Sequence, residues 1–196
     1  MSNHSRSKFK AVVIGVSTGG VAALKKILGE LPADFSLPVL IVSHIAPDAD
    51  DGLARLLDSF CTIHVKEADE MEEIFPGTAY LAPANYHLFV ERDGHLSLSV
   101  DPPVNFARPS VDMLFESAAE AFGPALIGVQ LTGAGSDGSK GLLKIKKSGG
   151  MAIVQDPEDA DMDSMPRSAL ELLQPDYMVP LKNLADLLVR LSMEKQ

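Results

Sequence analysis

The 196-residue sequence contains one cysteine, Cys61, and no tryptophan. A single thiol cannot form an intrachain disulfide, which excludes the small disulfide-stapled folds of secreted proteins and is compatible with a reducing compartment. His64 follows Cys61 by three residues. Two potential ligands are too few for a zinc centre, so we predict no metal site.

Long apolar runs are also missing. No segment approaches the roughly 18 consecutive apolar residues that a membrane-spanning helix needs, and the polar residues 1–10 lack the apolar core of a secretory signal. We therefore expect a cytoplasmic protein without membrane insertion. The length favours one domain, which we place at residues 11–192 after a flexible N-terminal segment at 1–10.

Basic residues are scarce. The chain has 17 Lys and Arg against 27 Asp and Glu, a formal net charge of -10. Residues 140–147 are the nearest approach to a basic cluster, and their spacing is typical of the solvated face of a helix. Because sequence-independent nucleic-acid binding needs clustered positive charge, we expect no nucleic-acid partner.

The sequence does contain a recurring order of apolar run, tight turn and helix. Residues 11–15 form an uninterrupted apolar run, and residues 21–31 follow with apolar side chains at helical spacing. Residues 38–43 form a second apolar run, and residues 125–131 with the helix predicted at 141–148 repeat the unit. Uninterrupted apolar strands are typical of a parallel sheet that is covered on both faces.

Shorter segments complete the pattern. The Asp93-Gly94 pair between residues 88–91 and 95–100 predicts an antiparallel hairpin. Further strands are predicted at residues 62–66, 77–81, 151–154 and 177–179, and further helices at 52–60, 110–122, 168–173 and 181–191. The predicted fold is α/β and doubly wound, with a mainly parallel sheet, helices on both faces and an antiparallel hairpin.

Ser17 stands in Gly15-Val16-Ser17-Thr18-Gly19, a G-x-S-x-G pattern between the first predicted strand and the first predicted helix. Glycines that flank a serine allow a sharp turn which exposes the hydroxyl. The amides that follow lie at a helix N-terminus, where partial positive charge stabilises an oxyanion. Taken alone, the motif is equally compatible with a helix cap or a phosphate-binding turn.

Two more polar residues follow buried strands. His44 ends the second predicted strand, and Asp137 lies in the Gly-rich turn after the strand at 125–131. In a doubly wound sheet such residues meet at the carboxyl edge, where ligands bind. A serine, a histidine and an aspartate that meet there can act as nucleophile, base and orienting group.

Two alternatives without catalysis stay open on these residues. In a nucleotide-binding α/β module, residues 15–20 hold a pyrophosphate, although a dinucleotide motif has glycine where Ser17 stands. In a catalytically silent receptor-binding module, the chain tolerates loss of Ser17. The presence of Ser17, His44 and Asp137 together argues mildly against the catalytically silent module.

Several motifs, taken in order, resemble the catalytic domain of the chemotaxis protein-glutamate methylesterase family, CheB. The resemblance covers nearly the whole chain. The matching residues are Ser17-Thr18-Gly19-Gly20, His44 and residues 131–138, with support from Leu81-Ala82-Pro83, Arg108-Pro109-Ser110-Val111-Asp112 and Met165-Pro166-Arg167. Motifs that match in register are more specific than any single serine pattern.

The resemblance implies hydrolysis of γ-glutamyl methyl esters on chemoreceptor cytoplasmic helices, with release of methanol, and deamidation of receptor glutamines as a further activity. It implies Ser17 as nucleophile, His44 as base and Asp137 as orienter. The oxyanion hole carries over to the backbone at Ala134, aided by Thr18. The reaction requires no metal or organic cofactor.

Three features depart from the family pattern. Most members have methionine at the position of Ala134, and many have glycine directly before the Met-Pro pair, where this chain has Ser164. Typical members also carry a receiver domain ahead of the hydrolase, whereas this chain reaches its first predicted strand at Ala11. We therefore expect constitutive activity or a regulator that acts in trans.

Overall fold

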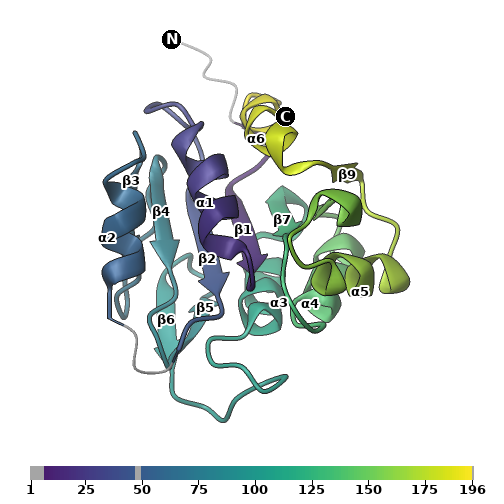
Figure 1. The fold of residues 1–196 in the computed structure, drawn as a ribbon. Helices are drawn as coiled ribbons and strands as arrows, with labels where there is room; N and C mark the ends of the chain where they lie inside the picture. Colours follow the sequence, from purple (N-terminus) through teal and green to yellow (C-terminus); the bar gives the residue numbers. More distant parts are fainter. Residues whose placement is uncertain (1–6, 47–49, 196) are drawn as a thin grey trace.

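The computed structural model describes residues 7–46 and 50–195 as a layered α/β domain (Figure 1). Seven strands form one parallel sheet in the order β3-β4-β2-β1-β7-β8-β9, and β5 and β6 form a separate antiparallel hairpin. The sheet strands are β1 (Ala11–Val16), β2 (Val39–Ser43), β3 (His64–Glu67), β4 (Thr78–Leu81), β7 (Leu126–Gln130), β8 (Met151–Gln155) and β9 (Tyr177–Val179). The predicted fold class is confirmed.

The central strands are buried on both faces. Every residue of β1, β2 and β7 is buried, which explains why their sequences are uninterrupted apolar runs instead of alternating patterns. Val16 of β1 pairs with Ser43 of β2, and Gly15 of β1 pairs with Gln130 of β7. These registers bring the residues that follow the three strands to one edge of the sheet.

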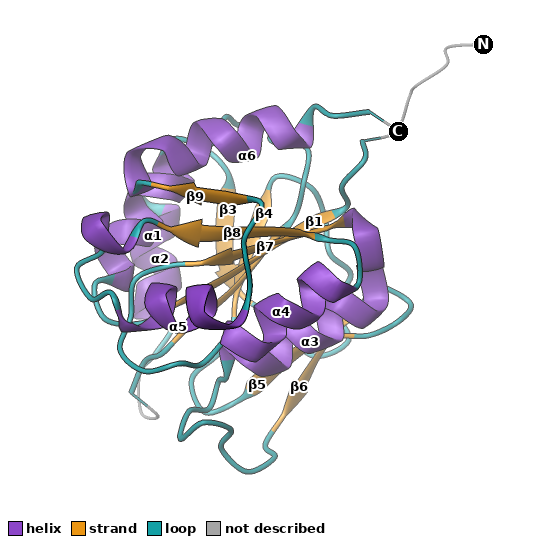
Figure 2. Cartoon of the chain, turned by 90° about the vertical axis from the view of Figure 1, so that its right-hand side faces the viewer, coloured by secondary structure: helices purple, strands orange, loops and turns teal. Residues whose placement is uncertain are grey.

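Two helical layers cover the sheet (Figure 2). One apolar core joins the sheet to α1 (Gly20–Gly29), α2 (Gly52–Asp58) and α6 (Leu184–Ser192). A second core lies on the opposite face beneath α3 (Val111–Phe122), α4 (Ser139–Lys147) and α5 (Ser164–Leu172), and includes side chains of β5 (His87–Val90) and β6 (Leu96–Ser99). None of the described helices is long and apolar enough to span a membrane.

Two helix starts differ from the sequence prediction by three residues or more. α5 begins at Ser164 instead of residue 168, because Pro166 lies in the first turn, where a helix does not need its N–H. α6 begins at Leu184, and the predicted residues 181–183 form a short 3-10 turn before it.

The N-terminal segment is partly described. Ser7 bridges Lys195, the Lys8 amide donates to the Glu194 carbonyl at 2.7 Å, and Phe9 is buried. Residues 7–10 are therefore packed against the C-terminal segment. The remaining part of the segment predicted to be flexible, residues 1–6, lies outside the described residues.

Candidate active site

Three predicted site residues lie at the carboxyl edge of the sheet. Ser17 directly follows β1, His44 directly follows β2, and Asp137 lies in the loop between β7 and α4. β1 leads to α1 on one face of the sheet, whereas β7 leads to α4 on the other. The gap between the ends of β1 and β7 is therefore the switch point at which doubly wound sheets bind ligands.

The turn around Ser17 is a sharp strand-to-helix elbow. The Ser17 amide donates to the Thr132 carbonyl at 3.0 Å, and the Gly20 amide donates to the Ser17 carbonyl at 2.8 Å. Gly19 adopts a left-handed φ of 81° at the N-cap of α1. A Cβ atom at Gly133 would lie 2.8 Å from the Ser17 Cβ atom, so glycine there lets the loop after β7 approach the serine.

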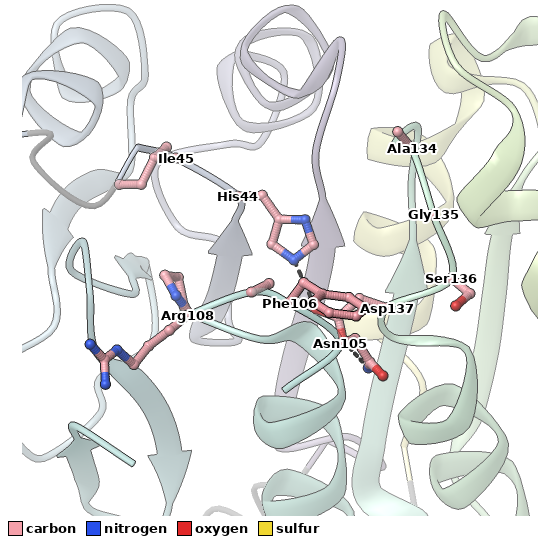
Figure 3. Close-up of a pocket in the computed structure, with 11 residues that line it drawn as sticks. His44, Ile45, Asn105, Phe106, Arg108, Ala134, Gly135, Ser136 and Asp137 are labelled. Carbon is pink, nitrogen blue, oxygen red and sulfur yellow. Dashed lines mark hydrogen bonds and ion pairs between the residues drawn. The ribbon is translucent and has the colours of Figure 1, made fainter. Parts of the chain in front are cut away.

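His44 and Asp137 are hydrogen bonded. The His44 Nε2 atom lies 2.8 Å from the Asp137 Oδ2 atom (Figure 3). Because an ionised carboxylate only accepts hydrogen bonds, the neutral imidazole carries its proton on Nε2 and leaves Nδ1 with a free lone pair. The ring is therefore oriented to take a proton at Nδ1.

A backbone hydrogen bond joins the segment that contains Ser17 to the segment that contains His44. The His44 amide donates to the carbonyl of Val16 at 3.1 Å, so the two chain segments run side by side. Among the hydrogen bonds recorded for residues 7–46 and 50–195, none joins the Ser17 hydroxyl to His44. Such bonds are often long without substrate and shorten in the reacting complex.

The Asp137 carboxylate is saturated with donors. It accepts hydrogen bonds of 2.7–3.2 Å from the His44 ring, the Asn105 side-chain amide, the Ser110 hydroxyl and the backbone amides of Val111 and Asp112. Burial alone raises the pKa of Asp137, but these bonds outweigh it and hold the pKa below its ordinary value. Asp137 is therefore an anion at neutral pH, fixed at the N-terminus of α3.

A second buried carboxylate, Asp112, lies beside the first. Its Oδ1 atom accepts from the Gly141 amide at 2.7 Å, and its Oδ2 atom accepts from Asn105 Nδ2 at 2.8 Å. The same Nδ2 atom donates to Asp137 Oδ1 at 2.9 Å. Burial, followed by the charge of Asp137, raises the pKa of Asp112 above its ordinary value. Asn105 thus bridges two carboxylates that repel each other.

Two backbone amides at this edge of the sheet have no hydrogen-bond partner within the described residues. Among the described residues, no recorded hydrogen bond uses the N–H of Thr18 or of Ala134. Thr18 lies in the elbow just before α1, and Ala134 lies in the loop after β7. The predicted oxyanion-hole role of Thr18 and Ala134 requires amides without such partners.

An open cleft of about 450 Å³ lies at this edge (Figure 3). Its lining includes His44, Ala134, Asp137 and the segment from Asn105 to Pro109. Ser17 is not one of its lining residues. In the described part of the chain, no group of three or more His, Cys, Asp or Glu side chains is arranged to hold a metal ion.

Comparison with known proteins agrees with this geometry. The sequence profile of the CheB methylesterase family matches residues 12–188. The chain belongs to the CheB methylesterase family. Family membership removes the nucleotide-binding alternative.

A Leptospira interrogans relative named "Putative protein-glutamate methylesterase/protein-glutamine glutaminase" is 51% identical over 184 residues, which cover 94% of this chain and 95% of that protein. A Burkholderia lata protein-glutamate methylesterase/protein-glutamine glutaminase is 43% identical over 188 residues, 94% of this chain. The match covers 52% of that longer protein, so the chain spans about half its length.

A solved structure shares the fold. The crystal structure of the Thermotoga maritima CheB methylesterase catalytic domain has a TM-score of 0.89 and 39% sequence identity, and the match covers 93% of this chain and 98% of that one. The two chains are therefore similar in sequence as well as in fold.

Sequence reasoning placed Ser17, His44 and Asp137 at one edge but missed the residues that hold Asp137. Ser110 and Asp112 lie in the CheB-like motif at residues 108–112, and the motif alone gave them no role. Ser110 is the N-cap of α3, a position that its residue type suggests, yet its hydroxyl donates to Asp137. No sequence signal marked Asn105.

Proposed function

We propose that this chain is a protein-glutamate methylesterase that hydrolyses γ-glutamyl methyl esters on chemoreceptors, and that it also deamidates receptor glutamines. The supporting observation is the His44–Asp137 pair, 2.8 Å apart, which leaves Nδ1 of His44 free and lies at the same edge of the sheet as Ser17, the residue after β1. The names of the relatives indicate the same two activities. The proposed setting is the cytoplasm, where the receptor helices are the partner.

The proposed first step forms an acyl-enzyme. The Ser17 hydroxyl oxygen attacks the ester carbonyl carbon, and its proton passes to Nδ1 of His44. Asp137 stays ionised, accepts the hydrogen bond from Nε2–H of the resulting imidazolium and stabilises its charge. The Thr18 and Ala134 amides stabilise the carbonyl oxygen as it becomes negative.

The second half of the reaction restores the enzyme. The ester C–O bond breaks, and methanol leaves with the proton that His44 held. Water then attacks the acyl-enzyme, His44 takes a proton from it and returns that proton to Ser17, and glutamate is released. For a glutamine substrate, the leaving group is ammonia in place of methanol. All groups in this cycle are side chains or amides of the chain itself.

The test is release of methanol from methylated chemoreceptor cytoplasmic fragments, with release of ammonia from the glutamine forms measured in parallel. The native chain should release methanol, and folded Ser17→Ala and His44→Ala proteins should not. Ser59→Ala is the matched control, because Ser59 lies next to α2 and its hydroxyl donates only to the Leu56 carbonyl. Equal release by native and Ser17→Ala proteins would contradict the proposal.

A further inference from the structure

A two-residue turn projects over the cleft. Val104 and Ala107 exchange backbone hydrogen bonds of 3.0 and 2.9 Å, so Asn105 and Phe106 form the tip of a tight hairpin. Both tip residues are left-handed, with φ of 50° and 64°. Turns of this kind favour asparagine followed by glycine. Phe106 therefore stands where glycine is the preferred residue.

Local stability does not account for a phenylalanine at this position. A side chain in the left-handed region is strained, and the strain is normally offset by burial or by a hydrogen bond. Phe106 is 105% exposed relative to its reference state, so its ring gains nothing from burial within the chain. Strain at a fully exposed aromatic residue beside a catalytic cleft is typical of a contact made with another molecule.

The turn is anchored on both sides. Asn105 donates to both buried carboxylates, at 2.8 and 2.9 Å. Two residues after Phe106, the Arg108 guanidinium donates to the Asn85 side chain and to the carbonyls of Val100 and Asp101 at 2.6–3.0 Å. The backbone that carries Phe106 is thus fixed beside the cleft, and the exposed ring lies near His44 (Figure 3).

We propose that Phe106 is the preset apolar anchor that holds the substrate protein while its target side chain enters the cleft. A helix presents residues three and four positions apart on one face, so an apolar side chain one turn from the target glutamate can pack on the ring. An aromatic side chain has only two side-chain torsions, so it loses little conformational entropy on binding. This inference rests on the proposed function and names the residue that selects a helical protein over a small ester.

The test compares Phe106→Gly with native protein on methylated receptor fragments and on a small glutamate γ-methyl ester. Glycine accepts the left-handed turn, so the variant should unfold at the same or a higher temperature. We expect kcat/KM on the receptor fragment to fall at least tenfold, mainly through KM, and kcat/KM on the small ester to fall less than threefold. Phe106→Tyr should restore most of the loss.

The matched control is Phe75→Ala, which removes a ring that is 57% exposed near the amino end of β4, at the opposite edge of the sheet. It should keep the native KM for the receptor fragment. In a Ser17→Ala background, Phe106→Gly should also weaken binding of the methylated fragment at least tenfold. The binding measurement requires no turnover.

If Phe106→Gly releases methanol with unchanged KM and unchanged binding of the receptor fragment, the proposed role of Phe106 is wrong. The proposed methylesterase function would not be affected by that result. Equal losses on the protein and on the small ester would also overturn the proposed role of Phe106, because the ring would then act on the chemistry. A native chain that binds receptor fragments through Phe106 but hydrolyses neither ester would instead contradict the proposed function.

Discussion

Asp137 and Asp112 are neighbouring carboxylates, 3% and 4% exposed, and they share one hydrogen-bond donor in Asn105, yet their pKa values shift in opposite directions. Asp137 accepts from three side chains and two amides of the α3 N-terminus. Asp112 accepts only from Asn105 and the Gly141 amide among the described residues, and the charge of Asp137 also raises its pKa. The number of donors, rather than burial, therefore accounts for the opposite directions of the two pKa shifts.

The difference between the two pKa shifts indicates different roles for the two carboxylates. Two buried carboxylates side by side push their pKa values apart, and the one with the lowered pKa is the one that touches His44. Asp112 joins the start of α4 to the 105–106 turn through Gly141 and Asn105. We infer that Asp137 carries the charge that the reaction uses and that Asp112 is a positioning residue.

Removal of the Asp137 charge should have the largest effect. In Asp137→Asn, the side chain can no longer accept all five donors, and an amide facing Nε2 favours the wrong tautomer of His44. We expect kcat to fall by about 10³- to 10⁴-fold. Methanol release from receptor fragments measures the change, and Asp93→Asn, at an exposed hairpin aspartate, serves as the control. A loss below tenfold would remove Asp137 from the proposed triad.

Removal of the Asn105 bridge should raise the pKa of both carboxylates, because Asn105 donates a hydrogen bond to each. Asn105→Gly keeps the left-handed turn but deletes the shared donor, so the pKa of Asp137 should rise towards its ordinary value. Loss of hydrogen bonds to charged groups should lower the free energy of unfolding by about 1.5–3 kcal/mol. Carboxyl carbon NMR titration and urea unfolding measure the two effects.

Asn105→Ala separates the hydrogen bond from backbone strain. It should shift the pKa of Asp137 as Asn105→Gly does but should be less stable, because alanine is strained at a φ of 50°. An unchanged Asp137 pKa in both variants would mean that the hydrogen bond from Asn105 does not lower the pKa of Asp137.

The smallest expected effect is in the pH dependence of stability. The folded-state pKa of Asp137 is lowered, so its ionised form adds to the free energy of unfolding. This stabilisation is present above the ordinary pKa of 3.8 and is lost as pH falls through the folded-state pKa. The folded-state pKa of Asp112 is raised, so its effect on the free energy of unfolding has the opposite sign. The free energy of unfolding falls as pH rises from 3.8 through the folded-state pKa of Asp112. The stability of native protein relative to Asp112→Asn should therefore be higher at about pH 4 than at about pH 7. Urea unfolding across this range measures it, and the opposite slope would contradict the shift.

Features set by local sequence were predictable. The buried strands β1, β2 and β7 follow from uninterrupted apolar runs, and the elbow at Ser17 follows from flanking glycines. Because carboxyl ends of parallel strands meet at one edge, these predicted strands were enough to place Ser17, His44 and Asp137 at the same edge. The hairpin of β5 and β6 followed from its Asp-Gly turn.

Features set by tertiary contact were not predictable. Asn105 and Ser110 lie 32 and 27 residues before Asp137 in the chain, and no periodicity indicates that their side chains meet it. The left-handed backbone of Phe106 breaks the residue preference of its turn, so a propensity argument points away from it. Both failures fall around the cleft, where function overrides local preference.

The most direct test of the proposed triad is kcat on methylated receptor fragments for Ser17→Ala, His44→Ala and the double variant. If the nucleophile and its base act as one unit, the double variant should be no slower than Ser17→Ala within about twofold. Losses that multiply in the double variant, or substantial methanol release by either single variant, would show that Ser17 and His44 act independently and would contradict the account.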